Sequence, residues 1–554
     1  MRTKWYKDAV VYQIYPRSFC DSNGDGFGDI QGIISKLDYL KDLGINCVWL
    51  SPVYDSPQED NGYDISNYKD IYPPFGTLKD FKQMLDEMHK RGIRLIMDLV
   101  VNHTSSQHPW FKDAISNPNS PYRDYYFIQK GKKNGKRPPN NWTSLFTGPA
   151  WERIKGTDDY YLHLFAKGQP DLNWDNPKVR EEVKDILRFW LDMGVDGFRC
   201  DVITLISKEQ PMKNDYSLFP LKGLNQYRYG PHLDEYLHEL YVDVYSHYDT
   251  MTVGETVMTS VEQGKKLVNE NEEKLDMIFN FDNTDVDNHF GVKYFLKKFK
   301  LTNLKKVYSK WQHALYGTGW NSLFIENHDQ RRSSGRFGTV SEGPLKEKSA
   351  KALAATYFLM RGTPFIYEGQ EIGMTNHNFK SIDEYQDIEA KNIYNLMEKY
   401  KILKPFLSKA FRDTNRDNAR TPMQWDDSEY AGFSKVKPWL KVNDNYKEIN
   451  AKKAIEDSNS LYHFYQKLIK YRIGNKILKD GEYSDLLPNN NKIYASKMSS
   501  DDGEILVIAN FTSKKQKCKL LPVDAKYKLV LTNEDRNEEN YLYEYEVRVY
   551  EYKK

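Results

Sequence analysis

Ionisable side chains stand at the ends of apolar segments, where buried strands seldom carry charges unless these are paired or functional. The segment GVDGFRCDVI has Arg199 and Asp201 in the middle of a run that is otherwise typical of a strand. Glu255 and Asp329 end two later apolar segments. Such carboxylates suit cleavage of a glycosidic bond, in which one carboxyl group attacks the anomeric carbon and another protonates the leaving oxygen. The complete set of these side chains is Asp98, His103, Arg199, Asp201, Glu255, His328 and Asp329.

Short apolar segments that are typical of buried parallel strands alternate with amphipathic, helix-like segments about eight times. This alternation predicts an α/β fold, a (β/α)8 TIM barrel. In such a barrel the carboxyl ends of the strands meet at one face, so we expect the ionisable side chains to converge there. The predicted strands lie in 10–16, 47–54, 94–103, 197–203, 251–255, 276–281, 321–329 and 364–369.

The chain is long enough for more than one domain. The third and fourth predicted strands are separated by far more than a normal loop, which predicts an inserted lobe. From about residue 481 the pattern changes to the alternation of an antiparallel β-domain. We therefore expect a barrel domain in two parts, 1–104 and 174–480 with a helical subdomain at about 370–480, an inserted domain at 105–173, and a C-terminal β-sandwich at 481–554.

Composition excludes several functional classes. The 80 Lys and Arg nearly balance the 78 Asp and Glu, so the basic excess of a nucleic-acid-binding protein is missing. No apolar run is long enough to span a membrane, and the N-terminus has no signal-peptide pattern. The four cysteines are scattered and show neither metal-site spacing nor a disulfide framework. We expect a cytoplasmic protein, a monomer, that acts on a small oligosaccharide without nucleic acid or membrane partners.

Six motifs in order along the chain resemble those of the α-amylase family of glycoside hydrolases, most of all its oligo-1,6-glucosidase branch. The resemblance covers essentially the whole chain, including the insert and the C-terminal β-domain. The motifs are DLVVNHTS (98–105), QPDLNWDNP (169–177), GFRCDVI (197–203), VGET (253–256), ENHD (326–329) and NARTPMQWD (418–426).

The resemblance implies a role for each candidate residue. Asp201 would be the nucleophile, Glu255 the general acid and then base, and Asp329 the group that stabilises the transition state. Arg199 would keep Asp201 ionised, whereas Asp98 would be structural. The remaining matched positions would close a pocket around one glucose unit, as in an exo-acting enzyme. The substrate-binding set implied is Asp60, Tyr63, His103, Phe165, Gln169, Arg199, Val202, His328 and Arg420.

Val202 directly follows the proposed nucleophile, and relatives that cleave α-1,6 links commonly have valine there. We therefore expect isomaltose and short isomalto-oligosaccharides as substrates. A plain barrel-core valine on a strand is the simpler interpretation. Two alternative activities stay open, trehalose-6-phosphate hydrolysis and sucrose-directed hydrolysis or isomerisation by glucosyl transfer. A non-catalytic relative, such as the barrel domain of a transporter subunit, would require a membrane anchor and would tolerate lost acids, and neither applies here.

Two residues near the seventh predicted strand depart from the usual pattern of the family. Arg331 replaces a proline, and Glu326 precedes Asn327 where many relatives have an uncharged residue. Arg331 could accept a phosphorylated sugar. We favour the simpler expectation that Arg331 pairs with Glu326.

The loop DSNGDGFGD has oxygen-bearing side chains at alternate positions and resembles the start of a calcium loop. It is not a complete EF-hand, because Gly32 stands where the bidentate Glu would be. An ordinary Asx/Gly turn is the simpler interpretation. The resemblance implies a structural Ca²⁺ and no organic cofactor, with the ligands Asp21, Asn23, Asp25, Asp29 and the carbonyl of Phe27.

Overall fold

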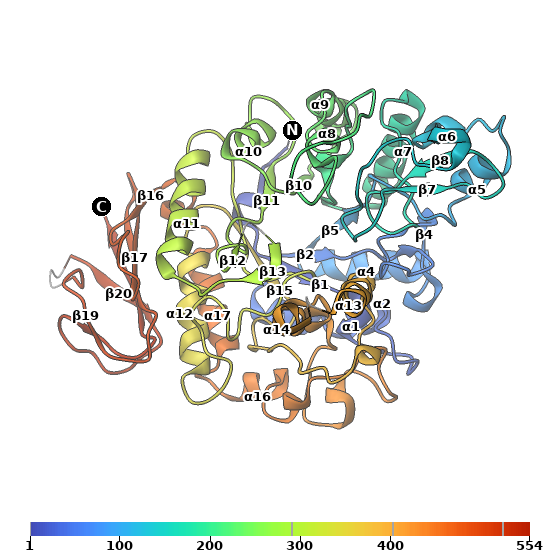
Figure 1. The fold of residues 1–554 in the computed structure, drawn as a ribbon. Helices are drawn as coiled ribbons and strands as arrows, with labels where there is room; N and C mark the ends of the chain where they lie inside the picture. Colours follow the sequence, from blue (N-terminus) through green and yellow to red (C-terminus); the bar gives the residue numbers. More distant parts are fainter. Residues whose placement is uncertain (1, 290–291, 402–403, 523–525) are drawn as a thin grey trace.

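Eight parallel strands form the central barrel that the sequence predicts (Figure 1). The structure is a computed structural model and describes residues 2–289, 292–401, 404–522 and 526–554. The strand order is β11-β10-β9-β5-β2-β1-β15-β14. The strands are β1 (Val11–Ile14), β2 (Cys47–Leu50), β5 (Arg94–Leu99), β9 (Gly197–Cys200), β10 (Met251–Thr256), β11 (Met277–Asn280), β14 (Ser322–Leu323) and β15 (Thr363–Tyr367).

The sheet nearly closes on itself. β14 and β11 are its two edges, and the Ser322 hydroxyl donates a hydrogen bond to the Ile278 carbonyl at 2.7 Å between them. The strands are shorter than expected, and β9 ends at Cys200, so Asp201 lies outside the ladder. The register places Asp98 of β5 opposite Arg199 of β9.

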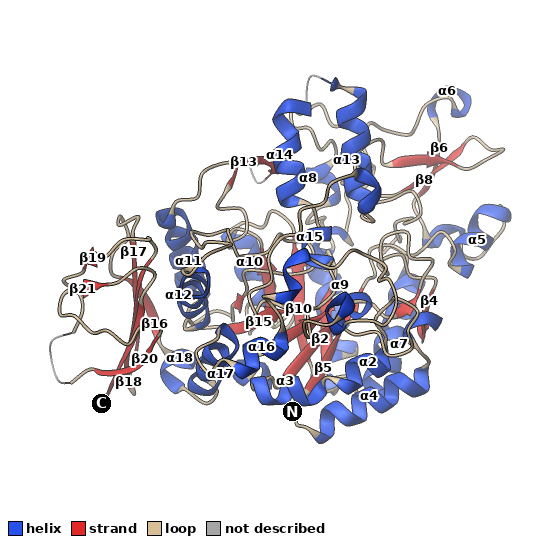
Figure 2. Ribbon diagram, turned by 90° about the horizontal axis from the view of Figure 1, so that it is seen from below, coloured by secondary structure: helices blue, strands red, loops and turns tan. Residues whose placement is uncertain are grey.

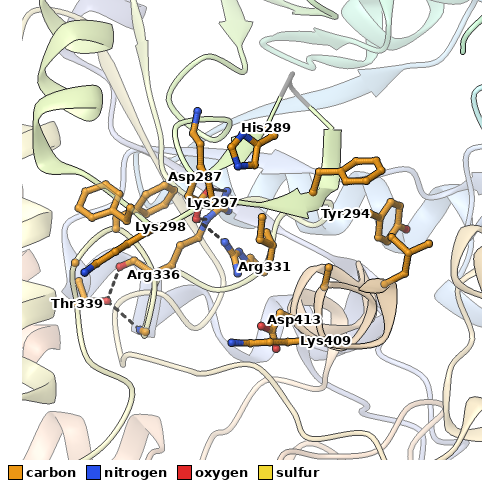
Figure 3. Close-up of a pocket in the computed structure, with 18 of the residues that line it drawn as sticks. Asp287, His289, Tyr294, Lys297, Lys298, Arg331, Arg336, Thr339, Lys409 and Asp413 are labelled. Atoms are coloured by element: carbon orange, nitrogen blue, oxygen red, sulfur yellow. Dashed lines mark hydrogen bonds and ion pairs between the residues drawn. The ribbon is translucent and has the colours of Figure 1, made fainter. Parts of the chain in front are cut away.

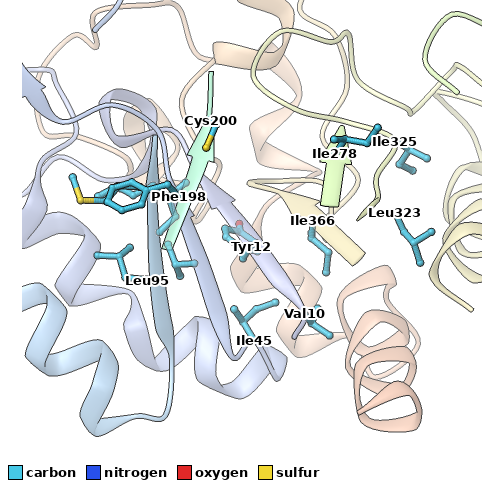
Figure 4. Packing of buried hydrophobic residues seen from close by; sticks show 14 of the residues in the cluster. Val10, Tyr12, Ile45, Leu95, Phe198, Cys200, Ile278, Leu323, Ile325 and Ile366 are labelled. Carbon is cyan, nitrogen blue, oxygen red and sulfur yellow. The ribbon is translucent and has the colours of Figure 1, made fainter. Parts of the chain in front are cut away.

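Both faces of the barrel strands are buried, and alternate residues of each strand belong to different clusters. Residues such as Val11, Trp49 and Phe279 pack together in a cluster inside the barrel. Their neighbours in sequence point outward and pack under the helices, as Tyr12 and Ile278 do (Figure 4). Because strand side chains alternate between faces, two apolar layers need nearly continuous apolar strands, which is the pattern in the sequence.

Helices cover the outside of the barrel. Their ends follow local sequence signals: Thr77 and Asp80 form a reciprocal capping box at the start of α4, and Gly194 ends α7 in the left-handed conformation. The principal covering helices are α2 (Ile30–Ser35), α3 (Leu37–Leu43), α4 (Leu78–Lys90), α7 (Pro177–Met193), α9 (Leu233–Asp243), α10 (Val261–Val268), α11 (Leu301–Leu315), α12 (Lys346–Phe358) and α17 (Leu461–Arg472).

The long connection between β5 and β9 contains a small three-stranded antiparallel sheet beside the barrel (Figure 1). The segment after β15 is mainly helical, as expected, and its helices α13 and α14 lie together on one side of the molecule (Figure 2). The elements of these two segments are α5 (Pro109–Ser116), β6 (Ile128–Lys130), α6 (Lys132–Gly135), β7 (Trp151–Arg153), β8 (Asp159–Leu162), α13 (Ile388–Lys399), α14 (Lys404–Thr414), α15 (Asp417–Arg420), α16 (Ala451–Glu456) and α18 (Lys476–Asp480).

The C-terminal segment forms an antiparallel sheet of five strands, which confirms the predicted β-domain, and a separate two-stranded pair. Its inner face belongs to the same apolar cluster as the barrel helices. The exact domain limits stay a prediction. No helix in the described part of the chain is long and apolar enough to cross a membrane. The strands are β16 (Glu482–Asp485), β17 (Ile493–Ser500), β18 (Gly503–Asn510), β20 (Lys528–Thr532) and β22 (Val547–Lys553), with the pair β19 (Gln516–Lys517) and β21 (Tyr541–Leu542).

Candidate active site

Arg199 joins three carboxylates at the carboxyl end of the barrel. One of its terminal nitrogens donates to Asp98 and also to Asp201, the latter at 2.6 Å, and the other donates to Glu255. Arg199 is only 2% exposed, so these contacts are made away from water. A buried guanidinium needs such partners, because an uncompensated buried charge is strongly destabilising. One side chain thus fixes the spacing of the candidate nucleophile and the candidate acid.

The two candidate catalytic carboxyl groups have different proton affinities. Burial raises the pKa of Asp201 to about 6, against the opposing effect of the Arg199 charge. Burial raises the pKa of Glu255 further, to about 8, against the opposing Arg199 charge, and the charges of Asp201 and Asp329 add to the rise. Between these values Asp201 is ionised while Glu255 keeps its proton. Paired carboxyl groups with separated pKa values are typical of acid and nucleophile in glycosidases.

Val202 lies in an unusual backbone conformation. Its φ of 35° and ψ of 39° are left-handed, which is a genuine outlier for a β-branched residue. The conformation turns the chain sharply after β9, and the Val202 N–H points at the Glu255 carboxylate at 3.3 Å. The simpler interpretation of Val202 as a strand residue in the barrel core is therefore wrong. Strained backbone of this kind concentrates at functional sites.

Two arginines from the segment after β15 hold Asp329. Arg420 donates to its carboxylate at 2.6 Å, and Arg416 lies 3.4 Å from the same oxygen. Burial would raise the pKa of Asp329, but its interactions with His328, Arg416 and Arg420 outweigh the effect of burial and hold the pKa well below its usual range. Asp329 is therefore ionised at every pH at which Asp201 is ionised.

Histidines and tyrosine form a buried hydrogen-bonded group beside the carboxylates. The His328 ring lies flat against that of Tyr63, with centroids 5.3 Å apart, and its Nε2 is 2.8 Å from the Tyr63 hydroxyl. The amide of Gln13 donates to Nδ1 of His328 at 2.8 Å, which assigns the ring proton to Nε2. Burial lowers the pKa of His328 to about 3, so the ring is neutral. A neutral ring can donate one hydrogen bond and accept another.

These side chains surround a cavity of about 210 Å³. Eight of the predicted residues line it. The other four predicted residues lie directly behind this lining: Gln169 donates to Asp60 at 3.1 Å, Arg420 holds Asp329, and Arg199 and His328 make the contacts given above. The eight lining residues are Asp60, Tyr63, His103, Phe165, Asp201, Val202, Glu255 and Asp329.

Several residues of the cavity wall were not predicted from the sequence. Arg416 is the most informative, because it bridges Asp60 at 3.2 Å and the buried Asp387 with Nε at 3.1 Å. Its place four residues before Arg420 in the RDNAR segment was a signal that could have identified it. Gln330 directly follows the ENHD motif, whereas Lys293 of β13 (Val292–Leu296) and Glu389 of α13 belong to segments without a distinctive motif. The missed lining residues are Phe146, Phe281, Lys293, Gln330, Glu389 and Arg416.

The expected pair between Arg331 and Glu326 is wrong. Glu326 is buried and pairs at 3.3 Å with Arg332, the residue that follows Arg331. Arg331 instead donates to Asp287, which lies beside a second cavity. Arg332 therefore takes the inward position, and Arg331 lines the second cavity.

The candidate calcium loop is tightly hydrogen-bonded. Asp21 accepts from the N–H groups of Gly24 and Gly26 at 2.7 and 2.9 Å, and Asp29 caps α2 through Gly32 at 2.7 Å. The side chains are of the right type for a hard cation. However, within the described part of the chain no three acidic, histidine or cysteine side chains are grouped as metal ligands. The Asx-turn interpretation accounts for the loop as it is arranged, and the calcium site stays a prediction.

Comparison with known proteins agrees with this geometry. The family model for the α-amylase catalytic domain matches residues 13–481. The chain belongs to the α-amylase family. It is 50% identical to an oligo-1,6-glucosidase of Parageobacillus thermoglucosidasius, over 100% of this chain and 98% of that protein. The family membership makes the chain a glycoside hydrolase and confirms the barrel with its C-terminal β-domain.

Solved structures of this family superpose closely on the chain. One is the trehalose-6-phosphate hydrolase of Bacillus licheniformis, with a TM-score of 0.92 and 43% identity, covering 99% of this chain and 100% of that one. Another is an isomaltulose synthase variant of Erwinia rhapontici bound to sucrose, with a TM-score of 0.94 and 41% identity, covering 99% of both chains. Relatives with this fold therefore have names that refer to different substrates.

Proposed function

We propose that this chain is a retaining, exo-acting α-glucosidase that hydrolyses the α-1,6-glucosidic links of isomaltose and short isomalto-oligosaccharides. The observation that carries the proposal is the arrangement around Arg199, which holds Asp201 ionised beside a Glu255 of higher pKa in a cavity of about 210 Å³. Pockets for drug-sized ligands usually measure roughly 300–1,000 Å³. The smaller cavity suits a single glucose unit.

The reaction would proceed by two displacements. In the first, a carboxylate oxygen of Asp201 bonds to the anomeric carbon while its bond to the leaving oxygen breaks, and Glu255 gives its proton to that oxygen. In the second, water gives a proton to Glu255 and attacks the same carbon, which releases glucose and frees Asp201. Both carboxyl groups bind the same guanidinium, which supports the short separation of roughly 5–5.5 Å found in retaining enzymes.

The other residues would position the sugar and stabilise charge. Asp329 stays ionised in the cavity wall and would stabilise the positive charge that develops on the glucosyl ring. His103 would bind hydroxyl groups of the sugar from the cavity lining, and the neutral His328 behind the lining would hold the Tyr63 hydroxyl in place. His103 lies 3.0 Å from the Tyr63 carbonyl and 3.2 Å from the Gln169 amide, contacts that fix its ring.

The α-1,6 preference rests on Val202 and on the named relatives. The Val202 side chain lines the cavity next to both catalytic carboxyl groups, where the leaving group would enter. Several relatives at 46–50% identity are named oligo-1,6-glucosidases, whereas a Bacillus subtilis relative at 45% is named a trehalose-6-phosphate hydrolase. Trehalose-6-phosphate or sucrose as substrate is therefore the second candidate.

The test is glucose release from isomaltose, maltose, sucrose, trehalose and trehalose-6-phosphate at equal concentration. We expect fast cleavage of isomaltose and weak cleavage of maltose. A preference for the phosphate ester or for sucrose would contradict the substrate assignment but keep the chemistry.

Two substitutions test the catalytic roles. Asp201→Asn should abolish turnover of every substrate. Glu255→Gln should lose most of its activity on isomaltose and far less on an aryl glucoside, because a good leaving group needs no proton. Equal losses on both substrates in Glu255→Gln would contradict its role as acid.

We also propose that the 21–29 loop binds a structural Ca²⁺. Support comes from four oxygen-bearing side chains, three of them carboxylates, in one short loop. Calcium would act on stability rather than on the reaction. Adding Ca²⁺ after chelator treatment should raise Tm, and Asp25→Asn, which removes a charge at an exposed position, should weaken the response. An unchanged Tm with and without Ca²⁺ would leave the loop as an ordinary turn.

The chain is further proposed to act as a monomer in the cytoplasm. All four cysteines are free and buried, which suits a reducing compartment. Size-exclusion chromatography with light scattering measures the oligomeric state directly, and a dimer mass would contradict the monomer.

A further inference from the structure

A large cavity lies outside the candidate active site. It measures about 1050 Å³, and none of the described residues that line it also lines the active-site cavity. Its walls come from the hairpin of β12 (Asn288–His289) and β13 (Val292–Leu296), from the loop around 331–339, and from α13 and α14 (Figure 3). This position leaves the cavity without a role in the proposed reaction.

The cavity is strongly basic. Its lining has five Lys or Arg side chains and two carboxylates, Asp287 and Asp413, which leaves a net charge of +3. The whole chain has a net charge of only +2, so the positive charge is concentrated at this place. Such a concentration attracts anions. The basic side chains are Lys297, Lys298, Arg331, Arg336 and Lys409.

Ion pairs within the protein do not neutralise all of the positive charge in this cavity. Arg331 and Arg336 share one buried carboxylate, Asp287, with Arg336 contacts of 3.0 and 3.1 Å (Figure 3). Burial lowers the pKa of Arg331, and the neighbouring Arg336 charge adds to the lowering while Asp287 opposes it. The side chains of Lys297 and Lys298 make no ion pair or hydrogen bond with any residue of the described ranges. One guanidinium and the lysines thus have capacity for an anionic group.

Apolar side chains form the rest of the wall. Phe295 is 55% exposed, and Phe299 also lines the cavity. A phenylalanine of this exposure offers a ring face that the fold itself does not cover. A bare inorganic anion would make no use of this surface. The combination favours a ligand in which a charged group is joined to a ring.

We propose that this cavity is a second binding site, for an organic phosphate whose phosphate group is held by Lys297, Lys298 and Arg331 and whose ring packs against Phe295 and Phe299. Arginine and lysine are the side chains that bind phosphate most effectively, arginine through two parallel hydrogen bonds. Neither the reaction proposed above nor the glucose pocket requires this site.

The two cavities share a wall, which makes coupling between them possible. Arg336 of the second cavity donates to Gln330 of the active-site cavity at 3.2 Å. Tyr294 of the second cavity donates to Glu389 of the active-site cavity at 3.0 Å. A phosphate that draws Arg331 and Arg336 away from Asp287 would therefore move Gln330. Any resulting change in sugar affinity must be reciprocal.

Isothermal titration calorimetry on the full chain tests the site. Glucose 6-phosphate and adenosine monophosphate are the two probes, and the tighter of them identifies the kind of ring. The Lys297→Gln/Lys298→Gln variant should bind the tighter probe about a hundredfold more weakly, because each lost contact with a charged group is expected to weaken binding about tenfold. Lys300→Gln is the matched control, since it removes a charge two residues after Lys298 at a position that does not line the cavity. This variant should bind the probe as the unmodified chain does.

Three outcomes would overturn the proposal. The first is no binding of either probe. The second is that inorganic phosphate binds as tightly as both organic probes, which would show that the phenylalanines do not contribute to binding. The third is competition between the probe and isomaltose with the same inhibition constant in the unmodified chain and in the double lysine variant. This result would place the probe in the glucose cavity. The binding measurement needs no turnover, so its failure is distinguishable from a failure of the proposed function.

Discussion

Arg199 decides the chemistry of the candidate site at the scale of single residues. It is buried and holds Asp98, Asp201 and Glu255 together, so one positive charge faces three carboxyl groups. Full ionisation of all three would leave two uncompensated charges in a buried place. Retention of the proton on Glu255, whose pKa is raised to about 8, relieves part of this repulsion.

This imbalance predicts a bell-shaped pH dependence of kcat/KM. Activity should fall below about pH 6, where Asp201 gains a proton and can no longer attack, and above about pH 8, where Glu255 loses the proton it must donate. Initial rates on isomaltose across both limbs measure the two values. An aryl glucoside serves as the control, because its alkaline limb should be weaker. An alkaline limb of equal depth on both substrates would contradict the role of Glu255.

The residue scale also shows the limit of motif matching. The motifs located the carboxylates. They did not separate Arg331 from Arg332, which are adjacent in the sequence but differ in their ion-pair partners and in the direction of their side chains. Arg332 is inside against Glu326, and Arg331 faces the second cavity. Which of two neighbouring side chains turns inward depends on the path of the chain after β14, and no motif encodes that path.

At the scale of elements, the first βα connection is held by a close backbone contact. A Cβ added at Gly32 would lie 2.0 Å from the Cys20 carbonyl oxygen. The glycine therefore lets α2 sit directly on the preceding segment, which carries the candidate calcium loop. This contact gives a structural reason for glycine at the place where a complete EF-hand has glutamate.

Gly32→Ala should accordingly destabilise the protein by about 1–3 kcal/mol, the usual range for overpacking. Thermal unfolding followed by circular dichroism measures the change in Tm. Gln31→Ala is the matched control, because Gln31 is an exposed neighbour on the same helix and its loss should change stability little. Equal Tm values for the two variants would show that the helix can shift to admit a methyl group.

At the scale of the whole molecule, the barrel helices and the C-terminal sheet share one continuous apolar cluster. Val507 and Val549 of the C-terminal sheet belong to the same cluster as the helices of the barrel, and β18 and β22 pack against α12. Lys305 of α11 also donates to the Asn490 carbonyl at 2.7 Å. The sheet is therefore expected to unfold with the barrel rather than independently.

Val507→Asp tests this dependence, since it would place an unpaired charge in the shared core. We expect a single calorimetric transition at a much lower Tm, with loss of activity at moderate temperature. Leu529→Asp provides the comparison, because Leu529 lies on the same sheet but is 37% exposed. A separate early transition of the sheet, with activity retained, would show that the two parts are independent.

The sequence by itself determined the barrel and the main carboxylates, because the alternation of apolar and amphipathic segments and the motif spacing are local properties of the chain. It placed Asp201 and Glu255 at strand ends, and the structure places them there.

Only the tertiary structure decided the rest. Arg416 enters the site because the segment after β15 folds back over the barrel, and Val202 takes a left-handed conformation because the chain must turn there. The basic cavity exists only where three segments, far apart in the sequence, come together. Such contacts depend on how the surfaces of distant elements fit one another, and this fit produces no recognisable pattern of residues in the sequence.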